Sequence, residues 1–301
     1  SELRQRLAAL TQSEIRAAAK QALVAEQQVG AQPGDARTVA VLPLRFSGTD
    51  SSLTPLERGA AELLVTDLSR SSQLTIVERE RMQALLDEMS LSRQQAADPA
   101  TTVRAGRLMR AGRIVSGQIT QLPERRLGLT TAVTDVPTTR TTGGAQGDDQ
   151  LDALFALEKR VALQLFDALG VTLTPSERAA VEERPTRSLA AFLAYSNGLA
   201  AEDRADFAGA ARLYGEAVRL DPSFRVAAER RDRAEAAAEG AEITTSRLET
   251  TLSGLEGGIS DAAGRGIAIE SFSALGGTMV GLINDLNPSI AVTMQGGART
   301  V

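Results

Sequence analysis

Short apolar runs alternate with segments of helical spacing along residues 37–172. Three runs contain β-branched residues, 38–44 (TVAVLPL), 74–77 (LTIV) and 113–120 (RIVSGQIT), and residues 127–133 (LGLTTAV) alternate between apolar and polar positions. Runs and alternation of this length are typical of strands with a buried face. We therefore predict four strands in this part of the chain.

A helix is predicted after the first strand. Thr54 can cap it, Pro55 suits its first position, and Glu57 completes the spacing of a capping box. Apolar residues then recur on one helical face until the helix ends near Ser71. The residues of that face are Leu56, Ala60, Leu63, Leu64 and Leu68.

Three further segments have helical spacing: 78–88, 101–108 and 151–169, the last of which stops at Gly170. The polar stretch 134–149 is predicted to be a turn that leads into the last of these helices. The resulting order is strand, helix, strand, helix, helix, strand, strand, helix. This order predicts an α/β fold with a mixed sheet flanked by helices.

A small all-α domain is predicted to follow. Residues 188–199 and 207–220 have the pattern of two antiparallel helices, and residues 224–239 that of a third helix covering them. The hairpin resembles a tetratricopeptide repeat, with a plain helical hairpin as the alternative. One repeat is too little for an independent solenoid, so it must pack on the α/β domain or on another subunit. The matching positions are Gly198, Ala210, Tyr214, Ala217 and Pro222.

The tetratricopeptide-like pattern also predicts where the chain binds protein. A helical hairpin of this kind offers a groove to a peptide, and we expect polar and aromatic side chains of the hairpin to contact it. The residues predicted to bind protein are Tyr195, Asn197, Arg204, Arg212 and Tyr214.

Two segments flank the predicted domains. Residues 1–29 carry a rough helical stripe, which predicts a helix docked on its own domain, with a partner-binding arm as the alternative. The tail is rich in glycine yet keeps apolar residues, in runs such as 267–272 and 290–294. We expect it to order against a neighbouring subunit, with disorder as the alternative. The predicted organisation is a helical arm and linker (1–36), the α/β domain (37–172), a linker (173–187), the tetratricopeptide-like domain (188–239) and a Gly-rich extension (240–301).

The composition argues against an enzyme. The chain has 301 residues, no Cys, no His, and Lys only at Lys20 and Lys159. The missing residue types exclude Ser/His/Asp and Cys/His catalysis, disulfides and nearly all zinc, copper and haem sites. We therefore expect no catalytic residues, no metal and no cofactor, and we keep a carboxylate-based hydrolase as the weakest alternative.

Charge and hydropathy narrow the classes further. The net charge is −5 and no segment is strongly basic, which argues against nucleic-acid binding. No run of 18 apolar residues occurs, so we expect no membrane-spanning helix. The aromatic fraction is only 3%, so we expect cores built from Leu, Val, Ile and Ala.

Two acidic patterns invite a chemical interpretation. The segment 143–149 (GGAQGDD) is similar to a phosphate or metal loop but lacks the ending of a P-loop, and Asp148 or Asp149 is better placed to cap the helix at residue 151 than to bind calcium with Asp152. A second group is predicted to be solvated helix charges. Its members are Glu78, Glu80, Asp87 and Glu88, interleaved with Arg79 and Arg81.

Four segments in order resemble the CsgG-like family. They are VAVLPLRFSG (39–48), LERGAAELLVTDLSRS (56–71), QLTIVERERMQALLDEM (73–89) and AGRLMRAGRIVSGQIT (105–120). The family includes the curli secretion channel, lipoproteins that activate penicillin-binding proteins, and FlgO-like flagellar outer-membrane accessory proteins. The channel has two inserted hairpins that form a transmembrane barrel, which needs strands of about 9–11 alternating residues. This chain lacks such segments, so it resembles the soluble members.

The resemblance implies a non-enzymatic scaffold or assembly protein of the bacterial envelope. It implies a periplasmic, outer-membrane-associated location, protein partners in the envelope, a homo-oligomer and no nucleic acid. A lipid anchor upstream of Ser1 would fit this family. The alternative function is a periplasmic docking regulator of a cell-wall synthase or of a secretion complex.

Overall fold

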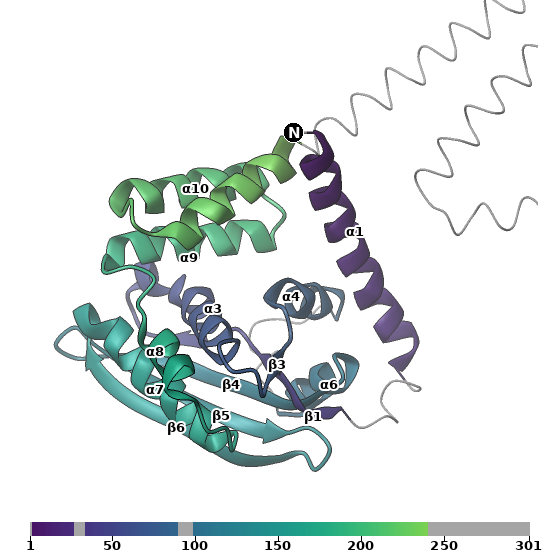
Figure 1. The fold of residues 1–301 in the computed structure, drawn as a ribbon, viewed down its shortest axis with the longest axis vertical. Helices are drawn as coiled ribbons and strands as arrows, with labels where there is room; N and C mark the ends of the chain where they lie inside the picture. Colours follow the sequence, from purple (N-terminus) through teal and green to yellow (C-terminus); the bar gives the residue numbers. More distant parts are fainter. Residues whose placement is uncertain (1, 27–33, 90–98, 240–301) are drawn as a thin grey trace, which may run out of the picture. The chain divides into compact units, whose positions relative to one another are not determined.

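A mixed sheet of six strands lies at the centre of the fold (Figure 1). The computed structural model describes residues 2–26, 34–89 and 99–239. The strand order is β3-β1-β4-β5-β6, with β2 also paired to β4. The pairs β1–β3, β1–β4 and β2–β4 are parallel, whereas β4–β5 and β5–β6 are antiparallel. The strands are β1 (Asp35–Val41), β2 (Arg45–Ser47), β3 (Thr75–Ile76), β4 (Ala111–Leu122), β5 (Arg126–Asp135) and β6 (Arg140–Gln150).

The four predicted strands are confirmed as β1, β3, β4 and β5, and the predicted turn over 134–149 is wrong. Most of that stretch forms β6, which pairs with β5 over nearly its whole length, for example at Thr130 and Gln146. It is an edge strand with a single buried residue, Ala145. Backbone hydrogen bonds to β5 hold such a strand, so its side chains need no apolar alternation.

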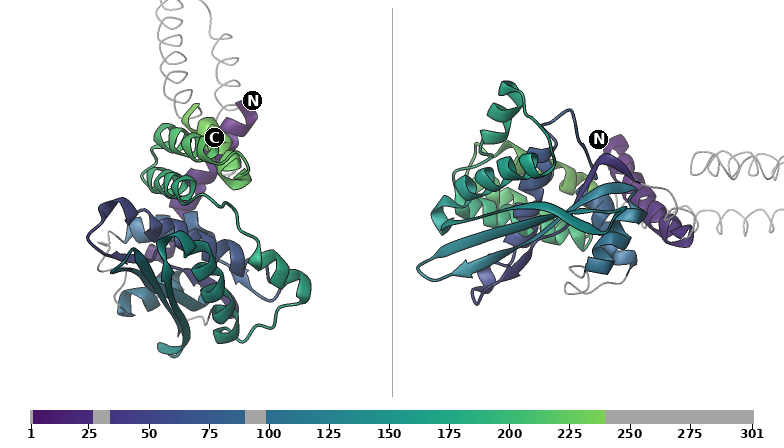
Figure 2. Two further views of the ribbon diagram at one scale, coloured as in Figure 1. Left: turned by 90° about the vertical axis from the view of Figure 1, so that its left-hand side faces the viewer. Right: turned by 90° about the horizontal axis from the view of Figure 1, so that it is seen from below.

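Helices pack on both faces of the sheet (Figure 2). Side chains alternate across β1, so Val39 and Val41 join the core beneath α3 and α7, while Ala40 and Leu42 join the core beneath α4 and α6. The predicted α/β architecture with a mixed sheet flanked by helices is confirmed. The helices are α3 (Leu56–Leu68), α4 (Arg79–Glu88), α6 (Pro99–Leu108) and α7 (Leu154–Ala168).

Two predicted helix starts differ from the structure. The capping box at α3 does not form, because the N-cap is Pro55 and the carboxylate of Glu57 instead accepts a hydrogen bond from the backbone N–H of Phe46 at 3.0 Å. Neither Asp148 nor Asp149 caps the helix at residue 151, since Asp148 pairs with Arg126 and Asp149 with Arg160. The end at Gly170 is as predicted, with φ of +70°, a conformation that glycine adopts without strain.

The N-terminal helix α1 (Glu2–Val24) docks through its second half on α4 and α6. Ala19 is buried in the same core as Met82 and Leu85 of α4. The side chain of Lys20 lies 3.8 Å from Glu88. The predicted docking of this helix on its own domain is therefore confirmed for the residues whose side chains the structure describes.

Beyond the sheet, the chain is helical. The linker contains α8 (Pro175–Glu182), whose capping box joins Thr174 and Glu177. Next, α9 (Leu189–Asp203) and α10 (Phe207–Leu220) form the predicted antiparallel hairpin (Figure 1), and residues 225–239 form the third helix. The tetratricopeptide assignment and the domain boundaries stay predictions.

The hairpin packs on the α/β part, one of the two solutions predicted for a single repeat. It does so through α9, which lies against α3. A Cβ atom on Gly59 of α3 would lie 2.0 Å from the hydroxyl oxygen of Ser196, so only a glycine permits this approach. All described residues belong to one compact unit, Ser1–Ala241. The predicted Gly-rich extension, with its runs at 267–272 and 290–294, lies outside the described residues.

Aromatic rings join the two parts, contrary to the expectation of purely aliphatic cores. Phe155 of α7 meets Phe192 of α9 edge to face, with ring centroids 5.2 Å apart. Tyr195 then contacts Phe192, Tyr214 and Phe224 with centroid distances between 5.0 and 6.2 Å. Five of the chain's seven Phe and two Tyr residues thus lie in this one cluster. Rare rings are concentrated where the hairpin is held on the sheet domain.

Close helix packing yields a matched pair of substitutions. A Cβ on Gly198 would lie 2.5 Å from the buried ring of Tyr214, whereas a Cβ on Gly215 would meet nothing nearer than 3.8 Å. Gly198→Ala is therefore expected to lower the free energy of unfolding by about 1–3 kcal/mol through overpacking. Gly215→Ala is expected to raise it by about 0.5–1 kcal/mol because alanine favours the helix. Urea unfolding followed by circular dichroism measures both, and equal effects of the two variants would contradict the close approach.

Among the residues that the structure describes, no helix has the length and the apolar character that crossing a membrane requires.

Candidate functional site

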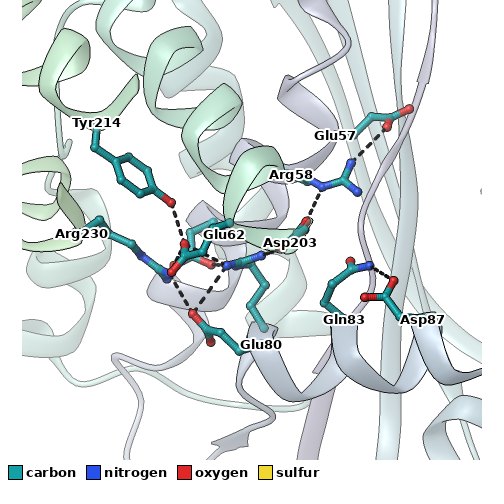
Figure 3. A network of polar contacts seen from close by, with 11 residues as sticks. Glu57, Arg58, Glu62, Glu80, Gln83, Asp87, Asp203, Tyr214 and Arg230 are labelled. Carbon is teal, nitrogen blue, oxygen red and sulfur yellow. Dashed lines mark hydrogen bonds and ion pairs between the residues drawn. The ribbon is translucent and has the colours of Figure 1, made fainter. Parts of the chain in front are cut away.

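Charged side chains from four segments meet beneath the hairpin (Figure 3). Arginines and carboxylates come from α3, from the start of α4, from the end of α9 and from residues 225–239, and a tyrosine hydroxyl from α10 joins them. We call this cluster the charge network. Its members are Arg58, Glu62, Arg79, Glu80, Glu202, Asp203, Tyr214 and Arg230.

Arg230 connects the third helix to three other segments. Its guanidinium donates to Glu62 at 2.6 Å, to Glu80 at 2.7 Å and to Glu202 at 3.0 Å. The Tyr214 hydroxyl donates to the same carboxylate of Glu202 at 2.6 Å. Only 7% of the Arg230 side chain is exposed, so these bonds form where water competes little for them.

Arg79 is the second bridge, and here the structure contradicts the prediction made from the sequence. It was predicted, with Glu80, to be a solvated helix charge, but 10% of its side chain is exposed and it binds Asp203. Its guanidinium also lies 3.3 Å from Glu202 and 3.4 Å from Glu62. Arg58 of α3 binds the other oxygen of Asp203. Because Glu202 and Asp203 are the last residues of α9, the end of this helix is tied to both α3 and α4.

The balance of charge in the network is negative. Three arginines face four carboxylates, those of Glu62, Glu80, Glu202 and Asp203. Burial by itself would raise the pKa of Glu80, but Arg230 and Arg79 outweigh it and lower this pKa to about 2. Glu80 is therefore ionised at neutral pH and stays paired with the arginines.

A second buried charge cluster lies between α3 and α7. Lys159 donates to both carboxylate oxygens of Asp67, at 2.7 and 2.8 Å, and its Nζ lies 3.3 Å from Glu158. The Glu158 side chain is fully buried. Burial, followed by the neighbouring carboxylate of Asp67, holds the pKa of Glu158 well above its usual range. One lysine therefore faces two buried acids here.

The residues predicted to bind protein do not form one surface. Tyr195 and Tyr214 are buried in the aromatic cluster and cannot present their rings to a partner in this structure. Asn197, Arg204 and Arg212 are exposed on α9, on the loop after it and on α10. Binding of protein by these three residues stays a prediction.

The charge network was missed because its signal is not local. Glu62 and Arg230 are 168 positions apart in the chain, and each occupies a position that helical spacing alone assigns to a polar face. A usable signal was the density of arginine and glutamate in three helices that also carry apolar faces.

The contacts within the two charged clusters hold helices in position. Each carboxylate of the charge network has an arginine within ion-pair distance, which leaves none placed as a free acid or base. Among residues 2–26, 34–89 and 99–239, no group of acids is arranged to hold a metal ion. The fold and the site thus define an α/β domain with a helical hairpin fixed on it by buried ion pairs.

Comparison with known proteins agrees with the motifs in the sequence. Residues 20–128 match the family described as curli production assembly/transport component CsgG. The matched part runs from the end of α1 to the start of β5, so the resemblance predicted from residues 39–120 is confirmed, and the hairpin lies outside it.

Three solved structures are similar to part of the chain. The LpoB C-terminal domain from Salmonella enterica is 14% identical, with a TM-score of 0.31, over 45% of this chain and 95% of that chain. The LpoB C-terminal domain from Escherichia coli is 16% identical, with a TM-score of 0.31, over 42% of this chain and 94% of that chain. The NMR structure of E. coli LpoB is 12% identical, with a TM-score of 0.33, over 42% of this chain and 63% of that chain. No curated protein matches the chain.

Proposed function

We propose that this chain is a non-enzymatic assembly protein of the bacterial cell envelope that works by binding other proteins. The observation that carries the proposal is the match of residues 20–128 to the curli assembly and transport family. We place the chain in the periplasm, associated with the outer membrane, because that is where the family resemblance puts it.

The buried contacts support a docking role. The charge network and the aromatic cluster tie the hairpin to α3, α4 and α7, so the two parts can offer a partner one preformed surface. The buried acids are paired with arginine or lysine, an arrangement suited to holding elements together rather than to proton transfer. In this view the chain acts through where it binds, without chemistry of its own.

Site-specific photocrosslinking in the encoding bacterium tests the proposal. A photoreactive amino acid at Asn197, Arg204 or Arg212 is expected to form an adduct with a particular envelope protein. The same residue at Thr142, exposed on the edge strand β6, serves as the control and is expected to give none. Absence of adducts at all three hairpin positions, or adducts with cytoplasmic proteins alone, would overturn the proposal.

Self-assembly is a separate part of the proposal. Light scattering of the purified chain measures it directly. A mass of several times 31.7 kDa is expected for a self-assembling scaffold. A monomer would remove self-assembly and leave the alternative, a docking regulator of a cell-wall synthase, which is then tested by its effect on the glycosyltransferase rate of the crosslinked partner.

A further inference from the structure

A groove of about 770 Å³ runs along the join between α3 and the segment that enters the helical hairpin. One wall comes from α3 and the turn after it, with Leu63 and Arg70, and the other from residues 183–188 and 221–226. Lys159 and Tyr195 lie deeper in the groove. We call it the linker groove, and no motif in the sequence pointed to it.

The mouth of the linker groove is basic, although the chain as a whole carries a charge of −5. Arg184, Arg187 and Arg225 are exposed there, and none of them forms an ion pair with another described residue. Arg70 adds a fourth guanidinium from the turn after α3. An arginine without a carboxylate is free to bind an incoming one, with two parallel hydrogen bonds.

The acids of the groove do not neutralise these arginines. Asp67 is paired with Lys159, and Glu62 with Arg230. Asp221 accepts hydrogen bonds from Thr186 and Ser223. Glu183 alone is left at the mouth without such a partner among the described residues. The four arginines therefore face two carboxylates that form no ion pair with a described residue, those of Glu183 and Asp221.

The floor of the groove holds an unsatisfied donor. The Tyr195 side chain is 2% exposed, and within the described part of the chain its hydroxyl has no hydrogen-bond partner. A buried hydroxyl without a partner costs about 1–3 kcal/mol, and such groups in native proteins call for a specific explanation. The hydroxyl is covered by its neighbours, among them Arg230 and Glu62, so it lies behind the surface of the groove.

The walls are partly apolar. Leu63, Pro185 and Phe224 line the groove, together with Val226, which is one of the few large apolar residues that the described structure leaves exposed. A free inorganic anion would use the arginines and leave this surface wet. A peptide with acidic and apolar side chains would cover both.

We propose that the linker groove binds an acidic peptide segment of a protein partner, with its carboxylates on Arg184, Arg187 and Arg225 and its apolar side chains against Pro185 and Val226. The proposal rests on the proposed docking function and names the chemistry of the partner.

Fluorescence anisotropy tests the proposal on the full chain. The probe is a labelled peptide of six Glu followed by Leu and Phe, and the control peptide carries Gln in place of Glu. The acidic peptide is expected to bind at least tenfold more tightly than the Gln peptide. The triple variant Arg184→Gln, Arg187→Gln, Arg225→Gln is expected to bind it at least tenfold more weakly than the unchanged chain.

Matched variants separate the groove from general electrostatics. Arg37→Gln, Arg107→Gln and Arg140→Gln together remove the same charge from exposed sites outside the groove, and binding is expected to change less than twofold. Tyr195→Phe removes a buried hydroxyl that lies behind the groove, and binding is expected to change less than twofold. Circular dichroism confirms that each variant is folded before its affinity is compared.

Three outcomes overturn the proposal. They are the absence of peptide binding, equal losses in the two triple variants, and displacement of the peptide by phosphatidylglycerol vesicles at lower anion concentration than by unlabelled peptide, which would assign the groove to a lipid surface. Photocrosslinks that persist at Asn197, Arg204 or Arg212 while the peptide fails to bind would reject the groove and leave the docking function standing. Failure of both experiments would reject both.

Discussion

Replacing Arg230 with methionine is expected to lower the free energy of unfolding by about 3–5 kcal/mol at pH 7. The substitution keeps most of the side-chain volume and removes the cation. Glu62, Glu80 and Glu202 would then share Arg79 alone, in a place where the Arg230 side chain is only 7% exposed. Removing one partner of a buried ion pair costs this much because the desolvated charges that remain are no longer compensated. Urea unfolding followed by circular dichroism measures the loss.

The next residue in the chain provides the control. Arg231 also forms ion pairs, with Asp232 and Glu235, but these lie at the surface. Arg231→Met is expected to change the free energy of unfolding by less than about 0.5 kcal/mol. A loss below about 1 kcal/mol for Arg230→Met, or equal losses for the two variants, would show that the charge network does not hold the helical part in place.

Lowering the pH is expected to reduce the difference in the free energy of unfolding between Arg230→Met and the unchanged chain. Because Arg230 and Arg79 lower the pKa of Glu80 in the folded state, this group stabilises the fold above its unfolded pKa of 4.5. That contribution is lost as the pH falls from 4.5 towards about 2, where Glu80 takes up a proton. The gap in stability between the two chains is therefore expected to narrow below pH 4.5.

Replacing Lys159 with methionine is expected to cost about 3–5 kcal/mol at pH 8. Asp67 and Glu158 would be left buried without their ion-pair partner, with only Arg70 still acting on Asp67. Both would then favour the protonated form in the folded state, whereas the unfolded chain ionises them near pH 4. Each proton that the folded state must retain lowers the stability by about 1.4 kcal/mol per pH unit above that point. The cost is therefore expected to shrink markedly between pH 8 and pH 5.

Glu158→Gln is the companion to this variant, but we expect it to raise the free energy of unfolding and not to lower it. In the unchanged chain the raised pKa of Glu158 means that its stabilising effect is fully present below pH 4.5 and is lost as the pH rises through its folded value. Glutamine imitates the protonated acid and does not titrate. We expect the variant to be about 1–3 kcal/mol more stable than the unchanged chain at pH 8, and equal to it near pH 4. Lower stability of Glu158→Gln at pH 8 would show that Glu158 is ionised in the fold.

Local pattern was enough for most of the architecture. The apolar runs at 38–44 and 113–120 correspond to β1 and β4, and the helical stripe beginning at Leu56 corresponds to α3. These elements bury a face within the same domain, so their side chains report the period of 2 or 3.6 directly. The family resemblance rested on the same segments, and the match over residues 20–128 agrees with it.

The edge strand of the sheet and the start of a helix could not be predicted from local pattern. The edge strand β6 is held by backbone hydrogen bonds to β5, and backbone bonds leave no trace in the choice of side chain. Glu57 had the spacing of a capping residue, yet its carboxylate binds the backbone of Phe46, a residue on the neighbouring strand. A capping box is a local preference, and a donor brought close by the fold displaced it.

The sequence by itself thus determined the α/β class, the helical hairpin and the absence of the residue types that most catalysis needs. Only the tertiary structure decided which charges are buried. Arg79 and Arg230 have the same helical surroundings in sequence as Arg81 and Arg231, but the fold brings the first two to Glu62 and Glu202 and leaves Arg231 at the surface. Helical period specifies the side of a helix on which a residue lies. Whether that side meets water or another helix is determined by contacts between residues up to 168 positions apart.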